Sequence, residues 1–163
     1  MSTIFKTNQE LKHIDLAKTL IDKNLYQEAY DHYKISINQN KECSFDILSF
    51  LYKKHIQKTD MQVNIGILIS KIYTLISMPT ESFEILEETL EDHPKSEPIY
   101  DELSKLIQKK SLTSRIKQQF EIGFKKKIFY SSIITILPKL YLEENNYTKA
   151  IEFYHTLLNE FPQ

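Results

Sequence analysis

The chain has 163 residues, a formal net charge of −1 at pH 7 and 41% hydrophobic residues. This length allows one domain with a sizeable core, and the small net charge gives no strong field toward nucleic acid or an anionic membrane. Only two glycines are present, which nearly excludes a glycine-rich phosphate-binding loop. We therefore expect no nucleic-acid partner and no nucleotide cofactor of that kind.

Three helices are predicted in the first third of the chain. Apolar residues recur at spacings of three and four over 8–23 and again over 26–39, which is typical of helices with one apolar face. Asn24 separates them, and Asn favours turns because it tolerates left-handed backbone. A further apolar stretch over 44–57 contains no Pro or Gly, and Ser44 at its start is a residue that caps helices.

The remaining two thirds of the chain also follow the helical period. Six helices are predicted, over 61–76, 81–92, 97–109, 114–127, 131–144 and 147–160. Pro79 and Pro94 lie in the breaks, where a residue without a backbone N–H stops a helix. No sustained alternation of apolar and polar residues indicates a strand. The longest apolar run, 63–78, contains Lys71 and is shorter than the roughly 20 residues of a membrane span. The sequence therefore predicts an all-α protein of nine helices with no membrane span.

A repeat relates the last three predicted pairs of helices. The last unit, 133–162, has two helices around Asn145-Asn146, and a constant step back along the chain finds bulky residues where this unit has bulky ones. The step takes Leu137 to Leu103 and then to Ile69, and it takes Tyr154 to Phe120 and then to Leu86. A fourth copy lies upstream after one longer interval, because NLYQEAYDHY mirrors NNYTKAIEFY. In this copy Leu16 and Leu20 fill the columns of Leu137 and Tyr141, Ala29 fills that of Ala150, and Tyr33 that of Tyr154.

This pattern resembles the tetratricopeptide repeat (TPR), a helix–turn–helix unit of about 34 residues with large and small apolar residues at fixed offsets. The matching residues of the last unit are Leu137, Tyr141, Tyr147, Ala150, Tyr154 and Pro162. The resemblance implies a right-handed α-solenoid formed by a single domain, 1–163. Its repeats would cover about 8–41, 63–96, 97–130 and 131–163. The interval between the first repeat and the second is longer than one period, and the additional residues predict an extra unpaired helix at about 44–57. The alternative is a degenerate fifth repeat that shares a helix with its neighbour.

The residues that could act as nucleophiles, general bases or metal ligands do not form a recognisable catalytic set. The five His residues have no second ligand at metal spacing on the same predicted helix face. Cys43 and His55 would pair only if the fold brought them together, and a buried thiol is the simpler interpretation. We therefore expect no catalytic residues, no metal and no cofactor, and hence no enzyme. A lone Cys fits a reducing cytoplasm, where we expect the protein to be located.

Lysine recurs two positions before the Tyr141 column in every repeat. The set, which we call the lysine column, comprises Lys18, Lys71, Lys105 and Lys139. Proteins that this chain resembles use that side of the first helix to line a concave groove for partner peptides. A stack of four lysines would favour an acidic partner segment. The alternative is that these lysines are solvated surface, because charged helix faces usually are and nearby acids (Asp15, Asp22, Asp101, Glu102 and Glu143) dilute the charge.

Two functional classes follow from these features. The first is a protein-interaction scaffold that binds a partner peptide in the groove, as the resemblance implies. The second is a structural or assembly subunit, or a segment of a longer repeat array, within a multiprotein complex. On the last helix, Ile151, Tyr154, Leu158 and Phe161 have no following helix to cover them, so we expect self-association through this C-terminal face. An enzyme is a distant third class.

Overall fold

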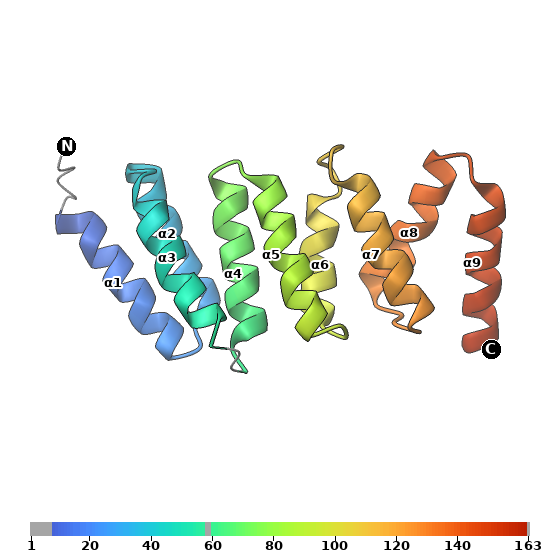
Figure 1. Ribbon diagram of the computed structural model, residues 1–163, viewed down its shortest axis with the longest axis horizontal. Helices are drawn as coiled ribbons and strands as arrows, with labels where there is room; N and C mark the ends of the chain where they lie inside the picture. Colours follow the sequence, from blue (N-terminus) through green and yellow to red (C-terminus); the bar gives the residue numbers. More distant parts are fainter. Residues whose placement is uncertain (1–7, 58–59, 163) are drawn as a thin grey trace. The chain divides into compact units, whose positions relative to one another are not determined.

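The computed structural model describes residues 8–57 and 60–162. Within these ranges every regular element is a helix, and no strand is present. The helices are α1 (Asn8–Asp22), α2 (Tyr26–Gln39), α3 (Cys43–His55), α4 (Gln62–Leu75), α5 (Pro79–Asp92), α6 (Glu97–Leu106), α7 (Thr113–Lys125), α8 (Ser131–Glu143) and α9 (Tyr147–Glu160) (Figure 1). The all-α class and the nine predicted helices are confirmed for this part of the chain. The chain divides into two compact units, Met1–His93 and Pro94–Gln163, called below the N-terminal and the C-terminal unit.

The same turn closes the first helix of three of the four predicted repeats. Asn24, Ser77 and Asn145 have positive φ angles of 62°, 67° and 56°. In each case the next N–H donates to the carbonyl five residues back: Leu25 to Leu20 (2.9 Å), Met78 to Tyr73 (2.8 Å) and Asn146 to Tyr141 (2.8 Å). These bonds satisfy carbonyls that the end of a helix leaves without partners. Consecutive helices thus pack with a recurring connection, which is consistent with a helical repeat.

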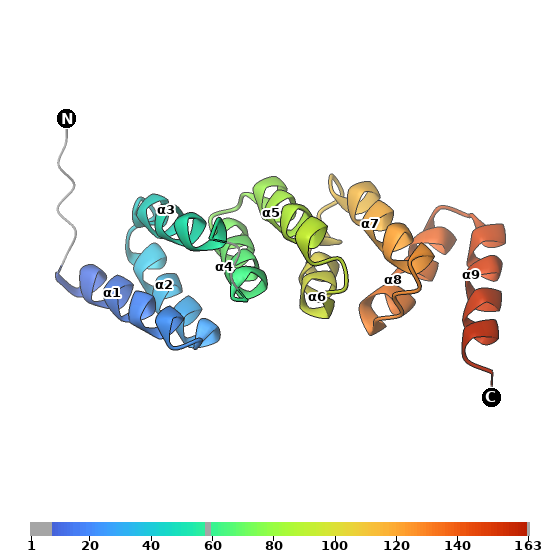
Figure 2. The same cartoon turned by 60° about the horizontal axis from the view of Figure 1, so that its bottom comes forward.

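In the N-terminal unit, α1 packs against α2 and α4 against α5, each pair joined by that short turn. Helix α3 occupies the position of the predicted extra helix and packs mainly against α4, which also contacts α2 (Figure 2). The predicted cap at Ser44 is wrong, because α3 begins one residue earlier and Ser44 is buried inside its first turn. The shared core contains Ile14, Ala17, Ile21, Ala29, Tyr33, Ile37, Ile47, Leu51, Ile65, Ile69, Ile72 and Ile85.

Helices α3, α4 and α5 meet at Gly66. A Cβ atom at Gly66 would lie 2.5 Å from Oγ1 of Thr89 and 3.3 Å from Nε2 of His55, so the close approach requires glycine. The Thr89 hydroxyl donates to the carbonyl of Ile85 (2.6 Å). Nε2 of His55 lies 3.0 Å from Oγ1 of Thr89, the hydroxyl oxygen. Because the hydroxyl proton is engaged, His55 donates from Nε2–H. The buried imidazole therefore joins α3 to α5.

The inward face of α1 differs from the prediction. Leu16 was expected to occupy the column of the buried Leu137, but its side chain is 42% exposed, whereas Ile14, Ala17 and Ile21 are buried. Among the described residues α1 packs most extensively on α2, and Lys18 and Asp22 on another face contact Phe50 and Lys54 of α3. The helix therefore buries the residues that face α2 and leaves Leu16 in solvent.

The C-terminal unit contains α6 to α9. Here α7 contacts α6 and α8, α6 contacts α8, and α9 contacts α8. Its buried apolar residues come from all four helices and the segments between them: Ile99, Tyr100, Leu103, Leu106, Leu112, Ile116, Phe120, Ile128, Ile133, Leu137, Leu140, Tyr141, Ala150 and Phe153. Helix α9 is capped by Asn146, whose Oδ1 accepts from the backbone N–H of Lys149 (3.2 Å). Such a cap stabilises a helix by about 1 kcal/mol.

Tyr33 provides a stability test of the N-terminal core. Its side chain is 0% exposed, and its hydroxyl has no hydrogen-bond partner among the described residues. Because a buried unpaired polar group costs about 1–3 kcal/mol, Tyr33→Phe is expected to raise the free energy of unfolding by roughly 1 kcal/mol in urea denaturation. Tyr26→Phe is the control, since the Tyr26 hydroxyl donates to Oδ1 of Asn24 (2.8 Å). Removing this paired hydroxyl should not raise the free energy of unfolding. A lower stability of Tyr33→Phe would contradict the prediction.

Candidate functional site

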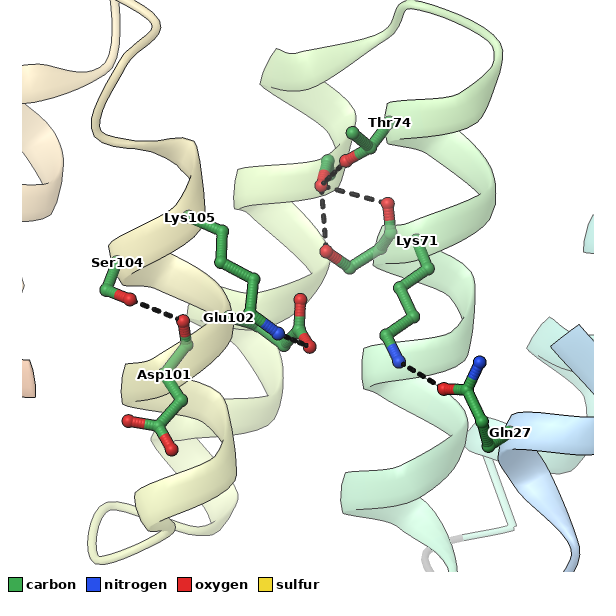
Figure 3. Close-up of polar contacts among 9 residues, drawn as sticks. Gln27, Lys71, Thr74, Asp101, Glu102, Ser104 and Lys105 are labelled. Atoms are coloured by element: carbon green, nitrogen blue, oxygen red, sulfur yellow. Dashed lines mark hydrogen bonds and ion pairs between the residues drawn. The ribbon is translucent and has the colours of Figure 1, made fainter.

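The two lysines of the lysine column in the N-terminal unit are held by neighbours in that unit. Lys18 forms an ion pair with Asp15 (3.3 Å), and its ammonium lies 5.7 Å from the centre of the Phe50 ring. Lys71 donates to Oε1 of Gln27 (3.1 Å, Figure 3) and lies 5.4 Å from the Tyr30 ring. Both ammonium groups therefore have aromatic and polar contacts that a ligand would have to share or replace.

The two lysines of the C-terminal unit differ from each other. Lys105 forms an ion pair with Glu102 one turn earlier on α6 (2.6 Å), and its side chain is 63% exposed (Figure 3). Lys139 is exposed on α8. An exposed ion pair at this spacing is worth only about 0.3–0.5 kcal/mol. Glu102 therefore orients the Lys105 side chain but leaves its ammonium group available to bind a partner protein.

Lys105 lines a hollow between α6 and α8, which we call the α6–α8 groove. Its volume is about 500 Å³, and its lining is Glu97, Asp101, Ser104, Lys105, Ser131, Ser132, Thr135 and Ile136. Glu97, Asp101 and Lys105 recur every fourth residue on α6, and Ser131, Thr135 and Lys139 occupy the equivalent positions one repeat later on α8. Residues four apart lie on one face of a helix. The groove is thus acidic at the start of α6 and basic at its end.

A second hollow lies between α7, α8 and α9, and sequence reasoning did not find it. Its volume is about 290 Å³, and Phe124, Tyr141 and Phe153 contribute its aromatic lining. The Tyr141 hydroxyl donates to Oε1 of Glu121 (2.9 Å), which also pairs with Lys149 (3.3 Å). The ammonium of Lys149 lies 5.5 Å from the Tyr141 ring. Burial, followed by the bond to Glu121 and its charge, raises the pKa of Tyr141.

No sequence signal could have located this second hollow, because Glu121 and Lys149 are 28 positions apart and only packing brings them together. Its volume is at the lower limit of small-molecule pockets, which is about 300 Å³. A further contact that sequence reasoning missed joins α1 to α2, where Nδ1 of His13 lies 2.8 Å from Nδ1 of His32.

Cys43 and His55, the nucleophile–base pair suggested by the sequence, lie far apart in the structure. Cys43 and His55 are at opposite ends of α3, and twelve residues of helix span about 18 Å. Cys43 is buried. In the part of the chain that the structure describes, no group of three or more His, Cys, Asp and Glu side chains is arranged to hold a metal ion. The same residues include no helix long and apolar enough to cross a membrane.

Comparisons with known proteins do not assign this chain to a family. No protein-family model matches the sequence, and no curated protein matches it significantly.

Proposed function

We propose that this protein is a TPR-like interaction scaffold, a right-handed solenoid that binds an extended segment of a partner protein and performs no catalysis. The observation that carries the proposal is the α6–α8 groove, whose two walls present equivalent positions one repeat apart. Repeat proteins of stacked helices use such surfaces to bind partners. A cytoplasmic location fits the single, buried Cys43.

The charges of the groove specify the chemistry of the partner segment. Among the lining residues, Glu97 and Asp101 favour a basic side chain and Lys105 favours a carboxylate. The exposed Lys139, one turn beyond the lining residue Thr135 on α8, adds a second positive charge near that end. Eight residues of α6 separate Glu97 from Lys105, which is about 12 Å along the helix. An extended peptide covers this distance with about four residues. The preference for an acidic partner expected from the lysine column is thereby narrowed to a segment with one basic and one acidic group about four residues apart.

The charge preference can be tested with three fluorescent peptides of equal length: one with a basic and an acidic group four residues apart, one all-acidic and one all-basic. The first is expected to bind the wild type most tightly. Replacing Lys105 and Lys139 by Glu removes two exposed contacts of about 0.2–1 kcal/mol each. The affinity for the first peptide should therefore fall about 2- to 30-fold by fluorescence anisotropy, and the difference should shrink as salt shortens the screening length.

The control variant carries Glu at Lys125 and Lys126, which are exposed near the end of α7. It has the same net charge as the groove variant but leaves the α6–α8 groove unchanged. Equal losses of affinity in both variants would mean that net charge, and not the groove, governs binding. Adding Glu at Lys71 to the groove variant tests whether the N-terminal unit contributes to the same preference.

A structural or assembly subunit of a larger complex is the second candidate function. The observation that favours it is the exposed apolar face of α9, where Ile151 and Leu158 are 57% and 63% exposed. Apolar surface of this extent is typical of interaction sites. Capture of the tagged protein followed by mass spectrometry separates the two functions, because a subunit co-purifies in a fixed stoichiometry and a groove ligand does not.

A further inference from the structure

Four large apolar side chains on the outer face of α9, followed by Phe161 at its C-cap, form an apolar stripe, and the Phe161 ring also packs edge-on against that of Phe129 (5.3 Å between centroids). Tyr147, Ile151, Tyr154, Leu158 and Phe161, which we call the α9 stripe, are each 50–63% exposed. Their spacings are four, three, four and three residues. This alternation is the seam pattern by which one helix packs along another. Exposing such a seam to water costs free energy that covering it would recover.

The charged side chains of α9 face away from the stripe. Lys149 pairs with Glu121 of α7 (3.3 Å), and Glu160 pairs with Lys127 (2.7 Å). Glu152 lines the hollow between α7, α8 and α9. At about 100° per residue, the positions that border the stripe are Thr148, Ala150, His155 and Leu157. The border therefore contains no Asp, Glu, Lys or Arg that would select a charged partner or resist desolvation.

The stripe has a palindromic order. Its residues read aromatic, aliphatic, aromatic, aliphatic, aromatic around Tyr154 at the centre. We propose that the α9 stripe is the contact surface for a second copy of this chain, with the two α9 helices antiparallel and Tyr154 near the two-fold axis. This order places Tyr147 against Phe161 of the other copy and Ile151 against its Leu158. A two-fold contact requires such self-complementarity, and antiparallel helix dipoles favour this orientation over the parallel one.

The area of the stripe sets the strength of the contact. A buried aromatic side chain covers about 150–250 Å², so five half-exposed residues present on the order of 500 Å² on each copy. The pair then buries on the order of 1,000 Å², at the lower end of specific interfaces. The dimer is accordingly weak and depends on concentration. It is independent of the α6–α8 groove, so loss of peptide binding and loss of dimerisation are separate outcomes.

Sedimentation equilibrium of the full chain over a range of concentrations tests the contact. The wild type is expected to approach twice the mass of one chain as its concentration rises. Replacing both Ile151 and Leu158 by Glu places four charges in the interface of a pair and should raise the dissociation constant at least tenfold. Because both side chains are more than half exposed, helix content measured by circular dichroism should not change.

The control variant carries Glu at Phe45 and Ile56, which are 72% and 71% exposed in and just after α3, and it should dimerise like the wild type. A wild type that stays monomeric at the highest concentration would overturn the proposal. The same conclusion would follow if the α3 variant lost dimerisation and the α9 variant kept it.

Disulfide cross-linking tests the orientation, since the native Cys43 is buried and does not compete. A mixture of Tyr147→Cys and Phe161→Cys chains should form mixed disulfides, and Tyr154→Cys should cross-link to itself. Cross-links confined to like positions at the helix ends, Tyr147→Cys to Tyr147→Cys, would overturn the antiparallel pairing.

Discussion

Replacing Phe120 by alanine is expected to lower the free energy of unfolding of the C-terminal unit by about 3–5 kcal/mol. The Phe120 side chain is 0% exposed, and its ring lies 6.0 Å from that of Tyr100, which is also buried. Truncation removes the transfer free energy of the ring and leaves a cavity that the surrounding helices can only partly fill. Since whole domains are stable by about 5–15 kcal/mol, the loss is a large fraction of the total.

The effect can be measured by urea denaturation followed by circular dichroism, with hydrogen exchange to assign the loss to α6–α9. Phe45→Ala is the matched control, because Phe45 is 72% exposed and its truncation should change stability by no more than about 0.5 kcal/mol. Equal losses of unfolding free energy for the two variants would show that Phe120 does not contribute to the packing of the core.

The repeat period was sufficient to place the helices. A unit with Asn in its turn, matched at a constant interval for the later helices and after one longer interval for α2, predicted the start of α2, α6, α8 and α9 at the observed residue. Helices α3, α4, α5 and α7 begin one or two residues from their predicted starts. Local signals account for this success, since Asn145 takes left-handed backbone and Asn146 caps the next helix. Helix ends were less accurate: α6 ends at Leu106, three residues before the predicted end, because turns with i→i−3 bonds follow it.

Burial and polar contacts were harder to predict, because both depend on which helices become neighbours. Leu16 shares its column with Leu137 but is exposed, since no described helix packs on that side of α1. The lysine column was recognisable from spacing, and the acids Asp15 and Glu102 were recognisable as its neighbours, whereas the contact of Lys71 with Gln27 was not predicted. The α6–α8 groove contains Lys105 as expected and Asp101, which the sequence already placed near the lysines, but the contribution of Glu97 and of Ser131 and Ser132 on α8 was not predicted.

Raising the pH above 10 is expected to destabilise both units through their buried tyrosines. Burial disfavours the phenolate and raises the pKa of Tyr33 and Tyr52 in the N-terminal unit. In the C-terminal unit burial likewise raises the pKa of Tyr141, and it raises that of Tyr100 to about 12, with the charge of Tyr130 as a further cause. The unfolded chain ionises at a pKa of about 10. Between pH 10 and the higher folded values, the unfolded state therefore releases protons that the folded state retains.

The sign of the effect follows from this proton release. Stability from these groups is fully present below pH 10 and falls as the pH rises, by up to about 1.4 kcal/mol per pH unit for each such tyrosine. For Tyr100 the decline extends from about pH 10 to pH 12, the value that burial gives its pKa. Several tyrosines acting together make this one of the largest changes expected for the protein.

Tyr100→Phe isolates one of these contributions. Within the described residues, the hydrogen bond of the Tyr100 hydroxyl is a long one, to the carbonyl of Pro94 (3.4 Å), so its removal costs little at neutral pH. Urea denaturation at intervals from pH 8 to pH 12 should show a difference between the wild type and Tyr100→Phe that stays constant below pH 10. Above pH 10 the variant should become progressively more stable than the wild type. Tyr147→Phe, a change at a tyrosine that is 59% exposed, should follow the wild-type profile. Parallel profiles for the wild type and Tyr100→Phe above pH 10 would contradict the prediction, because the Tyr100 phenol would then ionise as readily in the folded chain as in the unfolded one.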